Sequence, residues 1–168
     1  MRVPQLRPAT PADDAFFRVL YHSTRAEEAR ASGWPQAMIQ AFLDSQFAAQ
    51  QAGYAQSFPG AETFAVLLGA DSPEPVGRVI LYRSAHALRL VDFALSPPHR
   101  NRGLGTQLLA QLQQRAKHAG CPLELQVERG NRALALYLRT GFTRYGENAL
   151  RVQMIWQPHS ERETESPA

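Results

Sequence analysis

The chain has 168 residues, 44% of them hydrophobic and 20% charged, which is the size and composition of one globular domain. No apolar run approaches the roughly 20 residues that a membrane-spanning helix needs, and the N-terminal residues lack the apolar segment of a secretory signal. The formal net charge of +3 comes from scattered arginines, so neither a nucleic acid nor a membrane is expected as a partner. Because Cys121 is the only cysteine, no intrachain disulfide can form, and a cytoplasmic protein is expected.

Hydrophobic periodicity and turn residues predict a strand, two helices and a run of three strands in the first half of the chain. Thr10-Pro11 is typical of a helix start, because threonine can cap a helix and proline suits its first position. The predicted elements are a strand at 5–8, a helix from Pro11 onward, a helix at 36–52, and strands at 63–68, 76–82 and 88–95. The second helix is expected to bury one apolar side, formed by Met38, Ile39, Phe42, Leu43 and Phe47.

In the second half of the chain, helices alternate with strands. The predicted elements are a helix at 103–118, a strand at 123–127, a helix at 131–139 and a strand at 151–156, and the polar residues 158–168 are expected to be disordered. A run of strands followed by strand–helix–strand units favours a mixed α/β sheet with helices on both faces.

The segment from Arg100 to Thr106, with the sequence RNRGLGT, joins the strand at 88–95 to the helix that follows it. The first amide N–H groups of a helix have no partner within the helix, and their partial positive charge favours a phosphate. Gly103 and Gly105 leave room for a phosphate to approach the backbone, and the two arginines of the segment add charge. The segment lacks the lysine of a P-loop, and Leu108 stands where a dinucleotide-binding motif has its third glycine. Taken alone, the segment predicts a site for some phosphate.

Two segments together resemble the GNAT family of acetyltransferases. Arg100–Gly105 looks like the acyl-CoA pyrophosphate loop of that family, and residues 123–142, LELQVERGNRALALYLRTGF, are similar to its closing strand–helix motif. The resemblance covers about residues 5–157. It implies a single domain over residues 1–157, with an α/β fold: a mixed, mostly antiparallel sheet of about six to seven strands, flanked by four helices and splayed between the fourth and fifth strands.

The resemblance also implies acetyl-CoA as the co-substrate, and no bound metal. The backbone at the end of the fourth strand would contact the pantetheine arm, and the amide near Leu95 would polarise the thioester carbonyl. Asn131 would contact the pantetheine or the acceptor, although it could equally cap the helix that begins there. The implied cofactor-binding residues are Phe93, Ala94, Leu95, Arg100, Asn101, Arg102, Gly103, Leu104, Gly105, Thr106 and Asn131.

For the catalytic acid, the resemblance implies Tyr137, because a phenol can protonate the departing CoA thiolate. A core tyrosine with a satisfied hydroxyl is the alternative. A general base must remove a proton from the ammonium group of the acceptor. Gln126 stands where several N-terminal acetyltransferases of the family carry a glutamate, and it cannot act as a base. Glu128, on the same side of the strand, is one substitute, and Asp92 is the other unless an arginine pairs with it.

We therefore expect an N-acetyltransferase that moves an acetyl group from acetyl-CoA directly to a primary amine. The alternative is a non-catalytic acyl-CoA-binding or sensor module, because Gln126 replaces the usual base and the spacing from Asn131 to Tyr137 is one residue shorter than in many members of the family.

The acceptor is expected to be a small molecule or a peptide, and an antibiotic, a polyamine, an amino acid and a protein N-terminus all stay open. Its site should be built from the first two helices and their connection, where four aromatic residues could line it: Trp34, Phe42, Tyr54 and Phe58. The last strand could support a homodimer.

Overall fold

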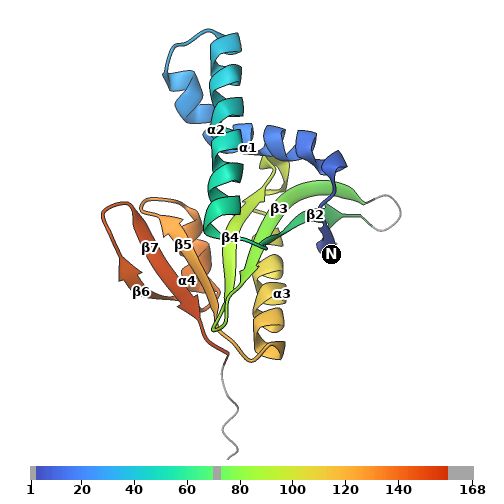
Figure 1. Ribbon diagram of the computed structural model, residues 1–168, viewed down its shortest axis with the longest axis vertical. Coiled ribbons are helices and arrows are strands. Elements are labelled where there is room, and N and C mark those ends of the chain that lie inside the picture. Colours follow the sequence, from blue (N-terminus) through green and yellow to red (C-terminus); the bar gives the residue numbers. More distant parts are fainter. Residues whose placement is uncertain (1–2, 70–72, 159–168) are drawn as a thin grey trace, which may run out of the picture.

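Figure 1 shows the computed structural model, which describes residues 3–69 and 73–158. These residues form one mixed sheet with the strand order β1-β2-β3-β4-β5-β7-β6. The strands are β1 Gln5–Pro8, β2 Glu62–Leu68, β3 Glu74–Arg83, β4 Leu88–Leu95, β5 Leu123–Glu128, β6 Thr143–Glu147 and β7 Arg151–Trp156. The helices are α1 Asp14–Ala31, α2 Gln36–Ser57, α3 Leu104–His118 and α4 Ala133–Arg139, with short 3₁₀ turns at Pro11–Asp13 and Pro97–His99.

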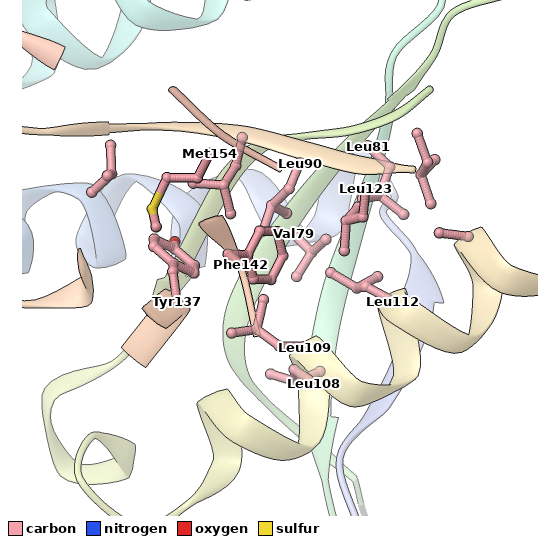
Figure 2. Packing of buried hydrophobic residues seen from close by; sticks show 14 of the residues in the cluster. Val79, Leu81, Leu90, Leu108, Leu109, Leu112, Leu123, Tyr137, Phe142 and Met154 are labelled. Atoms are coloured by element: carbon pink, nitrogen blue, oxygen red, sulfur yellow. The ribbon is translucent and has the colours of Figure 1, made fainter. Parts of the chain in front are cut away.

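The larger hydrophobic core lies between the sheet and α3. Leu108, Leu109 and Leu112 of α3 are fully buried against strand residues that include Val79 and Leu123 (Figure 2). Successive residues of a strand point to opposite faces, so a second set of strand side chains faces α1 and α2. On that face Phe17 of α1 packs with Ala65 and Leu67 of β2. The sheet thus has α1 and α2 on one face and α3 on the other, as the order of strands and helices along the chain predicts.

The sheet opens between β4 and β5, which are its parallel pair. They pair only over Leu88–Leu90 and Leu123–Leu125. Val91 is an extra residue in β4, because Ile80 of β3 pairs with Asp92 whereas the next residue, Leu81, pairs with Leu90. A bulge of this kind bends a strand and ends its regular pairing. Beyond it, residues 92–95 stay paired with β3 but have no partner on β5. The predicted splay between the fourth and fifth strands is therefore confirmed.

Most predicted elements are found, and two differ. The second helix runs to Ser57 rather than to about residue 52, because Gly53 does not break it and the chain turns only at Pro59-Gly60. Strand β6 was missed, because most of its side chains are polar and exposed at the edge of the sheet. Residues 159–168, the bulk of the tail predicted to be disordered, lie outside the described part of the chain.

The expected burial of Met38 and Phe42 on α2 is wrong. Met38 and Phe42 are 53% and 45% exposed, because the first half of α2 extends beyond the sheet (Figure 1) and leaves them without a core to enter. Phe42 instead packs edge-on against Trp34, with 5.5 Å between the ring centroids. Strand β7 is paired on both sides, with β5 and with β6, and the homodimer expected through this strand stays a prediction.

Candidate active site

The loop that follows β4 presents its backbone to solvent. Asn101 and Gly103 have positive φ angles of 57° and 77°, which turn the chain into α3 at Leu104. A Cβ atom added to Gly103 would meet nothing within 4 Å, so the space beside this glycine is open. The amides of Leu104, Gly105 and Thr106 are the first of α3, and their N–H groups have no partner within the helix. The loop therefore offers several N–H donors around open space, as an anion site requires.

Gly105 has a packing role that the sequence did not reveal. A Cβ atom there would lie 2.9 Å from Cδ2 of Leu136 on α4 and 3.8 Å from the Phe93 ring on β4. The glycine lets α3 approach α4 and β4 closely, which fixes the loop relative to the opening in the sheet.

The two arginines of the loop differ in what they contact. Arg100 turns back toward the protein: its Nε donates to the carbonyl oxygen of Leu95 at 2.8 Å, and its Nη2 donates to Oγ of Ser23 on α1 at 3.2 Å. Arg100 thus ties the loop to the end of β4 and to α1. Arg102 is exposed and makes no hydrogen bond or ion pair with the described residues, so its charge is the one available to a phosphate.

Asp92 follows the bulge in β4 and pairs with a buried arginine. Oδ2 of Asp92 accepts hydrogen bonds from Nε and Nη2 of Arg78, at 2.9 and 2.6 Å. Arg78 is only 3% exposed, and it also donates to Gln51 Oε1 at 3.0 Å and to Gln50 Oε1 at 2.9 Å, both on α2. The rings of Phe17 and Phe47 each lie 5.6 Å from its guanidinium carbon. The expected alternative for Asp92, an arginine partner, is therefore present, and it links β3 and β4 to α2.

Tyr137 of α4 lies in the core, with its ring 5.7 Å from that of Phe142 (Figure 2). It is 7% exposed, and its hydroxyl makes no hydrogen bond with a described residue. No buried side-chain oxygen in residues 3–69 and 73–158 lacks a partner, so the hydroxyl itself reaches solvent. Burial, and then the negative charge of Asp92, raise the pKa of Tyr137. The hydroxyl therefore stays protonated and can act as a proton donor.

Glu128 and Gln126 point to the α1 and α2 face of the sheet, opposite to the buried side chains of β5. Glu128 is exposed, and its Oε1 lies 3.9 Å from Nη2 of Arg25 on α1. Gln126 accepts a hydrogen bond of 3.5 Å from Nη1 of Arg151 on β7. On α2, burial and then the charge of Asp92 raise the pKa of Tyr54 to about 12.

The side chain of Asn131 caps α4. Its Oδ1 accepts a hydrogen bond of 2.9 Å from the amide of Ala133, the first residue of the helix. This contact supports the capping alternative for Asn131, and it leaves the amide group at the exposed surface.

Of the four aromatic residues expected around the acceptor, the structure brings only Tyr54 close to Asp92. Trp34 and Phe42 lie together on the part of α2 and its preceding loop that extends beyond the sheet. Phe58 packs on Tyr82 and on the guanidinium of Arg89, at 5.4 Å from each.

Sequence reasoning missed the buried Arg78, whose one signal is a charge within the apolar run 76–81. Across the described ranges, no three His, Cys, Asp or Glu side chains converge as metal ligands would. No helix among these residues is long and apolar enough to cross a membrane.

Both the sequence and the fold are similar to those of known acetyltransferases. The family model described as acetyltransferase (GNAT) family matches residues 21–142. The fold is similar to that of PaiA N-acetyltransferase from Thermoplasma acidophilum in complex with coenzyme A, with 17% identity, a TM-score of 0.68, and 92% of this chain and 99% of that chain covered. An acetyltransferase from Thermus thermophilus is similar at 22% identity and a TM-score of 0.64, over 93% and 99% of the two chains. No curated protein matches the sequence significantly.

Proposed function

Because the chain belongs to the GNAT family of acetyltransferases and is thus an acetyl-CoA-dependent acyltransferase, we propose that it transfers the acetyl group directly to a primary amine of a small molecule or peptide. The observation that carries this proposal is the opening between β4 and β5, which leads to the loop at residues 100–106. Asp92 lies where the opening begins, and its charge acts on the hydroxyl of Tyr137. An acyl-CoA bound on the loop would have its thioester between these groups.

On this proposal the donor is bound mainly by backbone. The free amides at the start of α3, together with the turn at Asn101 and Gly103 and the charge of Arg102, bind the pyrophosphate. Phe93, Ala94 and Leu95 have no partner on β5, so their backbone supports the pantetheine arm, and the amide near Leu95 polarises the thioester carbonyl. Arg100 holds the loop in place, and Asn131 adds a polar contact from the start of α4.

Replacing Gly103 with alanine should raise the Kd for acetyl-CoA about tenfold, because the methyl group occupies the space through which a phosphate reaches the amides. A non-glycine residue at its φ of 77° also costs about 1 kcal/mol of stability. Gly120, at the other end of α3, has a φ of 64° and equally open surroundings, so G120A is a matched control for this strain. Calorimetry with acetyl-CoA should find weaker binding in G103A alone, and equal affinities in the two variants would remove the loop from the binding site.

The acceptor amine must lose a proton before or as it attacks the thioester carbon. We propose Glu128 as the general base, acting through a water molecule, because its carboxylate is exposed on the same face of the sheet as Asp92. Oδ2 of Asp92 is occupied by Arg78, so this carboxylate is better suited to attract the ammonium group than to accept its proton. After attack, the collapse of the tetrahedral intermediate expels the CoA thiolate, which takes the proton of Tyr137.

Replacing Glu128 with glutamine should lower kcat/KM by about 100-fold, while the Kd for acetyl-CoA stays near its wild-type value. Steady-state kinetics with a saturating donor and a varied amine would measure this loss. Glu124, four residues earlier on the same face of β5, gives the control variant E124Q, which should retain the wild-type kcat/KM. If E128Q keeps the wild-type kcat/KM and D92N loses it, Asp92 is favoured as the base.

Stoichiometric release of CoA thiol across a panel of primary amines tests the activity as a whole. Acetyl-CoA binding without turnover of any amine class would favour the non-catalytic module instead.

A further inference from the structure

Opposite charges face each other across the opening of the sheet. Asp92 lies opposite Ile80 in the register of β3 and β4. Because Ile80 and Arg78 are two residues apart in β3, the side chains of Asp92 and Arg78 lie on the same face of the sheet. On the other side of the opening, Gln126 of β5 points to that face. Arg151 of β7 points to it as well, because Arg151 lies opposite Glu128 in the register of β5 and β7. Asp92 and Arg151 thus lie on the same face of the sheet, on opposite sides of the opening.

The negative side of the opening is fixed in position but not saturated. Both bonds from Arg78 end on Oδ2 of Asp92, and Oδ1 accepts no hydrogen bond from the described residues. The side chain is 18% exposed. Asp92 can therefore accept a hydrogen bond from an incoming amine while Arg78 and the two glutamines hold it still.

The positive charge on the other side of the opening is that of Arg151, which has no oppositely charged partner among the described residues. Arg151 is exposed, and in the part of the chain that the structure describes it forms no ion pair, although Glu128 is its neighbour across the two strands. Arg25 is the residue that approaches Glu128 instead, at 3.9 Å. The bond from Arg151 to Gln126 directs its guanidinium toward β5, which is the side of the opening.

We propose, on the basis of the function proposed above, that the acceptor is an amine with a carboxylate a few bonds away, such as an amino acid. Its amine would lie against Asp92 near the thioester, and its carboxylate would form a two-pronged pair with the guanidinium of Arg151. Gln126, already bonded to Arg151, would hold that guanidinium in place. A polyamine gains nothing from Arg151 and is repelled by it, so acceptors that carry only positive charge should be poor substrates.

Matched acceptors test this proposal: a set of amino acids, the corresponding carboxamides, and the amines that lack the carboxyl group. For the wild-type enzyme, kcat/KM should be at least about tenfold higher for the acid than for its two analogues. In R151M this ratio should fall to near one, and R151K should keep part of it, because lysine has the charge without the fork. The control variant is R144M. Arg144 is exposed on β6, opposite Met154 in the register of β6 and β7. This variant should keep the wild-type ratio.

Two results would overturn the inference. Wild-type enzyme that acetylates the amines as well as the acids would exclude carboxylate recognition while leaving the acetyltransferase function intact. An R151M variant that loses activity equally with all three acceptors would assign Arg151 a role other than carboxylate binding. If no amine is acetylated although acetyl-CoA binds, the proposed function itself fails, and this inference fails with it.

Discussion

Replacing Tyr137 with phenylalanine should lower kcat by about 100-fold or more, while the Kd for acetyl-CoA and the free energy of unfolding stay near their wild-type values. The hydroxyl is the only group removed, and it makes no hydrogen bond with a described residue, so the packing of the ring against Phe142 is kept. The lost rate reflects a thiolate that must leave without a proton donor. Single-turnover measurements of thiol release with a saturating amine would show the effect on the chemical step directly.

The pH dependence of this step follows from the raised pKa of Tyr137. Burial and the charge of Asp92 both favour the protonated phenol, so the proton is retained beyond the ordinary tyrosine value of about 10. The wild-type kcat should therefore show no alkaline decrease due to Tyr137 below about pH 10. Y145F, which removes a phenol from the exposed edge strand β6, is the control and should retain the wild-type kcat. A Y137F variant with wild-type kcat would show that Tyr137 is a core residue and not the proton donor.

The shape of the loop at residues 100–106 could be predicted from the sequence because it is local. The loop and the helix that follows it are contiguous, and the glycines and free amides of the proposed anion site lie within a few residues of one another. The same holds for Tyr137, which lies on a short helix with its own capping residue, Asn131. In both segments the spacing along the chain determines the position in space, so a sequence motif is enough to predict which residues lie together.

The surroundings of Asp92, where the acceptor is proposed to bind, could not be predicted in this way, because their contacts join distant segments. Arg78 meets Asp92 only through the register of β3 and β4, and that register depends on the bulge at Val91. It meets Gln50 and Gln51 only because α2 crosses the sheet at that point. The exposure of Met38 shows the same limit, since periodicity gives the apolar side of a helix but not how far the helix extends beyond the sheet.

Replacing Arg78 with methionine should cost about 3–5 kcal/mol of stability, because it leaves the part-buried carboxylate of Asp92 without its partner. The two glutamines on α2 lose their common donor as well, and the rings of Phe17 and Phe47 lose the cation between them. Urea unfolding of the free protein would measure this loss. The exposed pair Arg129–Glu147, with an N–O distance of 2.9 Å, provides a comparison, and R129M should cost less than about 1 kcal/mol.

A double variant separates charge from packing at this site. If the cost of R78M is mainly the unpaired carboxylate, R78M/D92N should be more stable than R78M by about 1–3 kcal/mol, since neutral asparagine needs no cation. Equal stability of the two variants would mean that Arg78 acts through its contacts with α2 and the aromatic rings. The first outcome would assign Arg78 the role of compensating the charge of Asp92 within an otherwise apolar strand.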